Sequence, residues 1–239
     1  MKNHLSNCFA ALVLAAWASS AAVAGTLDIT VTDRDGQPAA DVVVLVQLPN
    51  QPAPKPAAAP VVIAQENLRF VPFLTVVPVG STLRFVNQDG YDHHVRSVPS
   101  GPLGSMPSVE YFELRLDAAK QASRSSSYDD DYKPATAPSK KSGTTTADVK
   151  VGHAGPIGLG CHIHGSMRGQ VYVSATPWFA KTDAKGIAHI EGVPEGAAEL
   201  TLWHPDQLQE QAPLKVQVDA GPSSKAAGQL NFTPRRRRV

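Results

Sequence analysis

Aromatic and charged residues are scarce in this chain of 239 residues, at 6% and 18% respectively. The charges are also nearly balanced, with 22 Lys and Arg residues against 21 Asp and Glu residues. Because a neutral chain has no global electrostatic attraction for polyanions, we expect no nucleic-acid partner. Glycine and proline, by contrast, number 18 and 20, which is typical of short strands joined by turns.

Apolar runs of membrane-spanning length are missing after the N-terminus. Phe9 to Val23 is almost wholly apolar, but it is too short and too rich in alanine to indicate a transmembrane helix. The small residues of Ala22-Val23-Ala24 are typical of a cleavage site. We therefore expect residues 1–24 to be a signal peptide that is cut after Ala24. The mature protein is then expected in the periplasm or secreted, without stable membrane insertion.

Only two cysteines occur, Cys8 and Cys161. Cys8 lies in the expected signal peptide, so its removal leaves Cys161 alone and no internal disulfide can form. A single cysteine in an exported protein forms an intermolecular disulfide, stays as a buried free thiol or binds a metal. The residues around Cys161 must decide between these roles.

Short segments rich in Val, Thr and Ile alternate with turn signals and predict an all-β chain. Residues 51–60 are rich in Pro and Ala and are expected to form a linker. Residues 117–148 are polar and contain few large apolar side chains, so we expect a disordered insertion there. The expected strands are residues 27–33, 39–48, 61–65, 74–79, 81–87, 93–98, 109–116, 147–151, 170–175, 178–183, 187–193, 197–205, 214–218 and 228–232.

The C-terminal tail, residues 220–239, contains four adjacent arginines from Arg235 to Arg238. We interpret this run as a solvated end. Contact with an acidic partner or an anionic membrane surface is the alternative.

Residues 155–169 are interpreted as a Gly-rich loop between two strands. The loop contains a Cys-x-x-His-x-x-Met sequence formed by Cys161, His164 and Met167. Copper that alternates between Cu(I) and Cu(II) suits a soft thiolate, imidazoles and a weakly bound thioether. This loop therefore supplies three of the four donors that a redox-active copper needs.

The fourth donor is expected from a neighbouring strand, where His93 follows a turn after Asn87. His94 is the alternative, because only one of two adjacent strand residues can face the metal. His162 follows the cysteine and is expected to point away from the copper. A ligand to a second metal is its alternative role.

Two other chemistries are possible for Cys161. A catalytic cysteine requires a His base and an orienting Asn or Asp, whereas Met167 fits copper better. A zinc site would favour a further Cys, His or carboxylate over Met167.

An early His followed by a late Cys/His/Met loop resembles the type 1 copper site of the cupredoxin family. The sequences of residues 70–89, 93–98, 160–173, 176–186 and 202–205 resemble bacterial plastocyanin- and amicyanin-like proteins called methylamine utilization proteins. The resemblance covers roughly residues 27–116 and 149–205. It implies a cupredoxin-like Greek-key β-sandwich that binds one copper ion. His94 stands where the type 1 copper site of the cupredoxin family usually has Asn.

Residues 26–48 resemble the opening of a carboxypeptidase-regulatory-like β-sandwich. The turns at residues 182–186 and 194–196 resemble its continuation. The resemblance implies that residues 26–48 and 176–219 form one small sandwich that flanks the cupredoxin-like domain, residues 61–175. The alternative is that residues 26–48 form the first strands of the cupredoxin-like domain.

Four donors saturate a copper ion and leave no open position for a substrate. The sequence therefore predicts an electron carrier, not an enzyme, with copper bound by His93, Cys161, His164 and Met167. An unidentified redox protein is the expected partner, docking on an apolar rim at residues 156–159. Copper handling, sensing or assembly is the alternative function. An enzyme would need a second, open copper site built on His94 or His162.

Overall fold

The computed structural model describes residues 24–104, 106–107, 110–119, 144–219 and 223–235. Nearly all of the expected signal peptide, most of the expected insertion and the end of the arginine run lie outside these residues. The described residues form sixteen β-strands and no helix. The prediction of an all-β fold is therefore confirmed. None of the described segments is a helix long and apolar enough to cross a membrane.

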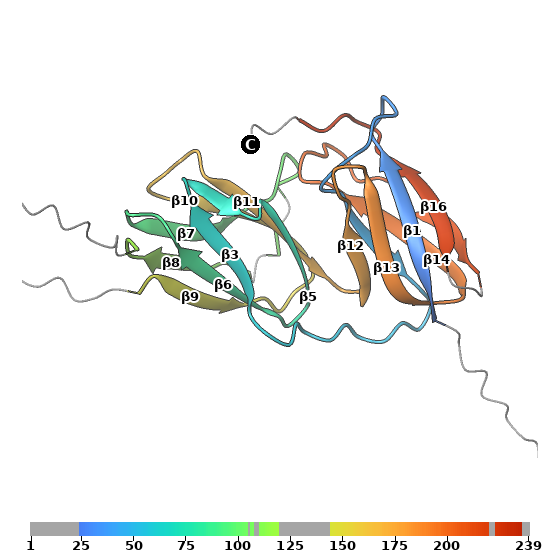
Figure 1. The fold of residues 1–239 in the computed structure, drawn as a ribbon, viewed down its shortest axis with the longest axis horizontal. Coiled ribbons are helices and arrows are strands. Elements are labelled where there is room, and N and C mark those ends of the chain that lie inside the picture. The colour runs from blue at the N-terminus through green and yellow to red at the C-terminus, as the bar shows by residue number, and fades with distance from the viewer. Residues whose placement is uncertain (1–23, 105, 108–109, 120–143, 220–222, 236–239) are drawn as a thin grey trace, which may run out of the picture.

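One β-sandwich combines the first two strands with the last five, so the blue and the orange to red ribbons of Figure 1 lie together. One of its sheets has the order β13-β1-β16 and the other β12-β2-β14-β15. We refer to it as the flanking sandwich. Its strands are β1 (Ala24–Thr32), β2 (Val43–Gln47), β12 (Trp178–Lys181), β13 (Ile187–Pro194), β14 (Gly196–Trp203), β15 (Leu214–Val218) and β16 (Ser224–Gln229).

The intervening strands build a second β-sandwich, which holds the candidate site. Its sheets have the orders β5-β11-β10-β7-β8 and β4-β3-β6-β9. We refer to it as the central sandwich. Its strands are β3 (Val61–Glu66), β4 (Arg69–Val71), β5 (Leu74–Pro78), β6 (Thr82–Asn87), β7 (His93–Val98), β8 (Glu113–Leu116), β9 (Thr146–Lys150), β10 (Gly155–Cys161) and β11 (Arg168–Ser174).

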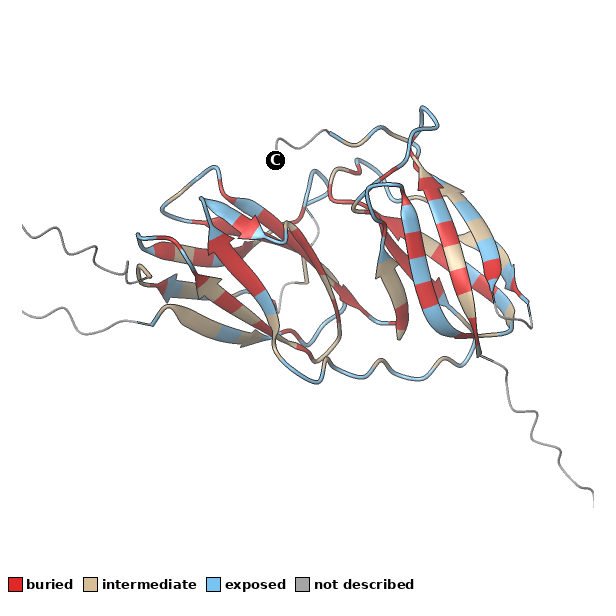
Figure 2. Cartoon of the chain, viewed as in Figure 1, coloured by how far each residue is buried: buried red, intermediate tan, exposed pale blue. Residues whose placement is uncertain are grey.

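Alternation of buried and exposed residues gives each sandwich its own core, as the striped strands of Figure 2 show. Strand β2 departs from this rule because its valines are buried on both faces. Val44 and Val46 pack in the core of the flanking sandwich, whereas Val43 faces a separate apolar cluster. The Val-rich run in the sequence reflects this double burial.

That separate cluster joins the two sandwiches. It brings Val43 and Trp203 of the flanking sandwich against Leu74 of the central sandwich. The rings of Tyr172 and Trp203 lie 5.0 Å apart between their centroids. Burial raises the pKa of the Tyr172 hydroxyl. The central sandwich is therefore anchored on an apolar face, which fixes its position beside the flanking sandwich.

Two segments differ from the sequence-based expectation. Residues 155–161 are not loop but strand β10, which pairs with β7 on one side and β11 on the other. Strand β9 begins at Thr146, so the last residues of the stretch 117–148 also belong to a sheet. There, Asp148 accepts two hydrogen bonds from the guanidinium of Arg84, at 2.8 and 2.7 Å. That pairing explains why a polar segment can still form a strand.

Candidate metal centre

Three of the residues predicted as copper ligands converge at one end of the central sandwich. Nδ1 of His93 and Nδ1 of His164 are 3.2 Å apart. Sγ of Cys161 lies 3.7 Å from the first nitrogen and 3.6 Å from the second. Among the described residues, these three form the one cluster of Cys, His, Asp and Glu donors close enough to hold a common metal ion.

The donor triangle has the size that a metal ion requires. A circle through atoms separated by 3.2, 3.6 and 3.7 Å has a radius of about 2 Å. In zinc sites, for comparison, metal–nitrogen bonds are about 2.0–2.1 Å and metal–thiolate bonds about 2.3 Å long. An ion can therefore contact all three donors from a position at or slightly off the centre of the triangle. A soft thiolate with two imidazoles suits copper, so the residues present fit that metal.

The strands position the donors by simple alternation. His93 opens β7 and is buried, and Cys161 ends β10 and is 2% exposed. The next residue of β7, His94, then falls on the opposite face. The structure thus places His93 with the thiol and sets His94 apart from it. His164 follows in the short loop between β10 and β11.

Met167 is buried, at 1% exposure, and belongs to the same apolar core cluster of the central sandwich as Cys161. Its amide donates a hydrogen bond to the carbonyl oxygen of His164 at 3.0 Å. This turn closes the loop that carries the last two predicted ligands. The thioether is thus held within the core at the end of the ligand loop.

Backbone hydrogen bonds tie the two ligand segments together. The amide of His94 donates to Sγ of Cys161 at 3.4 Å, and the amide of His162 donates to the carbonyl oxygen of His94 at 2.8 Å. The first bond also supports negative charge on the sulfur, because an N–H group stabilises a thiolate acceptor. These contacts need only the backbone of His94, so its unusual side chain does not prevent them.

Asp89 is a site residue that the sequence-based reasoning missed. Its Oδ2 atom lies 2.9 Å from Nε2 of His93. A proton on Nε2 donated to this carboxylate leaves the lone pair of Nδ1 directed into the donor triangle. In the sequence analysis this residue belongs only to the turn that follows Asn87. Its spacing of four residues before His93 was the available signal.

The carboxylate of Asp89 also holds the turn between β3 and β4. It accepts hydrogen bonds from the amides of Asn67 and Leu68 at 2.7 and 3.2 Å. Burial alone would raise the pKa of Asp89. The hydrogen bonds from His93, Leu68 and Asn67 oppose it and together hold that pKa below its usual value.

His164 is the donor nearest the surface, since it is half-buried whereas the side chain of His93 is fully buried. The ring of Tyr91 lies 5.4 Å from the ring of each histidine. Tyr91 is 41% exposed and Ile163 is 56% exposed, so two large side chains surround this donor at the surface.

The predicted apolar rim at residues 156–159 is wrong. Ile157 and Leu159 are buried in the core of the central sandwich, at 0% and 1% exposure. Gly158 is also buried, and an added Cβ there would lie 2.8 Å from the carbonyl oxygens of Val98 and Pro99. Gly158 therefore allows close packing of a central strand and does not mark a flexible loop.

Three further histidines and Met106 lie outside the donor triangle. His153 bonds Glu110 at 2.9 Å, and His189 bonds Asp28. His204 is buried, and its Nδ1 accepts a hydrogen bond from the amide of Asp206. Met106 is half-buried against the core of the central sandwich.

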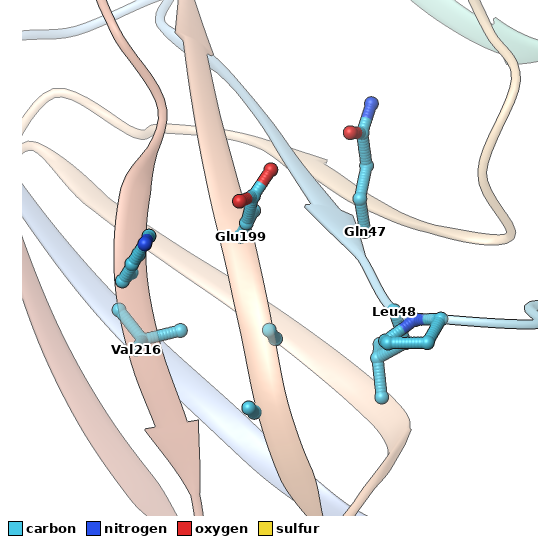
Figure 3. A pocket seen from close by; sticks show the side chains of 8 residues that line it. Gln47, Leu48, Glu199 and Val216 are labelled. Atoms are coloured by element: carbon cyan, nitrogen blue, oxygen red, sulfur yellow. The ribbon is translucent and has the colours of Figure 1, made fainter.

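A surface pocket lies on the flanking sandwich, between β2, β14 and β15. Gln47, Glu199 and Val216 line it, as Figure 3 shows. None of its lining residues belongs to the candidate metal centre.

The sheets and the donors define a class of protein: a β-sandwich with a candidate His/Cys/His metal site at one end. The solved structures to which the chain is similar include cupredoxins. A point mutant of amicyanin in its oxidized state has 17% sequence identity to this chain and a TM-score of 0.32. The match covers 54% of this chain and 98% of amicyanin. The purple cupredoxin from Nitrosopumilus maritimus has 17% identity, with coverages of 48% and 99% and a TM-score of 0.31.

A copper-containing nitrite reductase from Thermus scotoductus SA-01 is also similar, with 18% identity and a TM-score of 0.33. The match covers 50% of this chain but only 25% of the reductase. No protein-family model matches the chain, and no curated protein matches it.

Proposed function

We propose that the protein is an exported single-electron carrier that binds one copper ion through His93, Cys161, His164 and Met167. The donor triangle of one sulfur and two nitrogens, 3.2–3.7 Å apart, carries this proposal. Copper bound there would supply one-electron exchange between Cu(I) and Cu(II). The expected cleavage after Ala24 supports a periplasmic or secreted location.

The protein scaffold suits this role because it fixes the donors and excludes water. His93, Cys161 and Met167 are each at most 2% exposed. Two of them lie on paired strands, and the amide of His94 donates to the sulfur. Donors held in this way need little rearrangement when the charge of the site changes. Four protein donors would also leave no position for a substrate, which supports a carrier over an enzyme.

The half-buried His164 offers a route for electrons to reach the surface. Tyr91 and Ile163 provide apolar contact area around it. A redox partner protein that docks there would approach the site without displacing a ligand. This replaces the rim expected at residues 156–159.

The test combines copper content, visible absorption and stopped-flow electron exchange with small redox reagents. One copper per chain, strong absorption of a Cu(II)–thiolate bond and fast exchange are expected. Cys161→Ser should abolish the absorption. Met167→Leu should alter it, whereas Met106→Leu, a matched change elsewhere in the same sandwich, should not.

Colourless protein after copper loading and oxidation would contradict the site assignment. Slow exchange together with ready transfer of Cu(I) to a chelator would instead indicate copper handling.

A further inference from the structure

The outer face of the sheet β5-β11-β10-β7-β8 is covered in part by the flanking sandwich. Along β11, Val171 packs in the core of the central sandwich, so by alternation Tyr172 and Arg168 point to the outer face. Tyr172 packs against Trp203 of the flanking sandwich, whereas Arg168, which directly follows Met167, is exposed. The outer face is thus open at the end that carries the candidate metal centre.

Three arginines lie together on this open part of the face. In the register of the sheet, Arg168 of β11 and Arg96 of β7 pair with Gly160 of β10 from opposite sides. Nη1 of Arg168 lies 3.7 Å from the position that a Cβ of Gly160 would occupy, so the guanidinium lies above the glycine. Arg115 of β8 pairs with His94, two residues before Arg96, and therefore shares the face. We refer to Arg96, Arg115 and Arg168, all of them exposed, as the arginine cluster.

The arginine cluster has no counter-charge within the part of the chain that the structure describes. None of the ion pairs formed there by an arginine or a lysine includes a member of the cluster. Glu113 lies opposite Arg96, but its carboxylate contacts Nε2 of His94 at 2.7 Å and accepts a hydrogen bond from the hydroxyl of Tyr111 at 3.2 Å. Because like charges that lie together repel one another, an anionic partner on this face would relieve that repulsion.

The composition of the face suits a protein partner with exposed carboxylates. A guanidinium can form two parallel hydrogen bonds with one carboxylate, which gives geometric specificity as well as attraction. Tyr111, 63% exposed, adds a large amphipathic side chain to the same face. Arginine and tyrosine are the residue types that dominate the binding energy of protein interfaces.

We propose that the arginine cluster docks an acidic surface of the redox partner protein. This inference rests on the proposed electron-carrier function, and it adds the charge of the partner to it. The whole chain is nearly neutral, with 22 basic and 21 acidic residues, so the attraction is local to this face. Since Arg168 directly follows Met167, a partner held there lies beside the ligand loop. The association is expected to weaken as salt is added, because salt screens exposed charges.

The test compares two one-electron oxidants of opposite charge, the anion hexacyanoferrate(III) and the cation tris(phenanthroline)cobalt(III). Each accepts one electron from the reduced, copper-loaded full chain, and the return of visible absorption gives the rate. At low salt, Arg96→Glu and Arg115→Glu should each slow oxidation by hexacyanoferrate(III) about tenfold, the lower end of electrostatic steering. Neither variant should slow the cobalt reagent. Arg34→Glu makes the same charge change at an exposed arginine of the flanking sandwich and should leave both rates unchanged.

A polyglutamate peptide then stands in for an acidic protein. It should compete with hexacyanoferrate(III) in the wild type and in Arg34→Glu, but not in Arg96→Glu. Unchanged hexacyanoferrate(III) rates in both cluster variants, or equal slowing in Arg34→Glu, would overturn the proposal.

The two oxidants also separate this inference from the proposed function. If neither of them oxidised the wild type, the electron-carrier function would fail. Calorimetry of polyglutamate with the metal-free full chain would then still test the cluster. Weaker binding in Arg96→Glu than in Arg34→Glu is expected, and equal binding would overturn the arginine cluster as a docking surface.

Discussion

The carboxylate of Asp89 lies 2.9 Å from Nε2 of His93, and both side chains are buried. The carboxylate thus places a negative charge behind a candidate metal ligand. Such a charge stabilises the more positive, oxidised state of a redox metal. It also fixes which nitrogen of His93 is free to bind the metal.

Asp89→Asn is therefore expected to raise the reduction potential of the copper-loaded protein. We expect a shift on the order of 60 mV, which is a tenfold change in a one-electron equilibrium. Cyclic voltammetry or a redox titration measures it. Asp92→Asn is the control, because Asp92 is exposed on the same loop and bonds only the amide of Ala118 at 2.9 Å among the contacts described. An unchanged or lower potential in Asp89→Asn would contradict this role.

Asp89 should also make the metal-free protein sensitive to acid. A carboxyl whose pKa is lower in the folded than in the unfolded state stabilises the fold above its unfolded pKa. That contribution is lost as the pH falls through the folded pKa. Burial opposes the lowered pKa of Asp89, but the hydrogen bonds from His93, Leu68 and Asn67 outweigh it.

Asp89→Asn should accordingly be less stable than the wild type near neutral pH. The difference in free energy of unfolding should become smaller below about pH 4, where carboxyl groups protonate. Urea unfolding of both metal-free proteins across this range measures this difference. Asp28 and Asp148, whose pKa values are also lowered, remain in both proteins and cancel in the difference. A difference in unfolding free energy that does not change with pH would contradict the role of the ionised Asp89 in stability.

The strands around the site were predictable because they depend on patterns of neighbouring residues in the sequence. The strand that ends at Asn87 and the one that opens at His93 both follow from alternation and the Asp-Gly turn. The contact between Asp89 and His93 was not predictable in this way. A turn was already a sufficient reason for an Asp at position 89. Only the folded loop shows that the carboxylate of Asp89 faces the imidazole ring of His93.

The segment 155–161 was misinterpreted for a different physical reason. Glycine is common in loops, but Gly158 is required here by the close approach of the carbonyl oxygens of Val98 and Pro99. Close packing between strands that are distant in sequence can also require glycine, so a central strand can be as rich in glycine as a flexible loop. Only the observed pairing of β10 with β7 and β11 distinguishes the strand from a loop.

Gly158→Ala is therefore expected to destabilise the metal-free protein by about 1–3 kcal/mol, the usual cost of overpacking. Its added Cβ would lie 2.8 Å from two backbone oxygens, which cannot move without distorting β7. Gly165→Ala is the control, since a Cβ at this position meets nothing within 4 Å, and it should change stability by less than about 0.5 kcal/mol. Thermal unfolding measures both. Equal stability of the two variants would argue against close packing at Gly158.

The last prediction concerns residues 120–143, which lie between β8 and β9. The amide of Asp117 donates to the carbonyl oxygen of Thr144 at 2.9 Å, so the chain meets itself on either side of this segment. Replacing residues 120–143 with a short Gly/Ser linker should therefore preserve copper binding. Stability should change by about 1 kcal/mol or less, because the cost of loop closure depends only weakly on length.

Residues 117–119 should be kept in that variant, because they hold the loop that precedes His93. Asn87 donates to the carbonyl oxygen of Asp117 at 2.8 Å, and the amide of Ala119 donates to the carbonyl oxygen of Asp89 at 2.8 Å. Extending the replacement to residues 117–143 places flexible Gly/Ser residues at these two backbone partners, so they are held less firmly and copper binding should weaken. Visible absorption during a copper titration compares the two variants. Loss of copper binding in the shorter replacement would show that residues 120–143 themselves support the site.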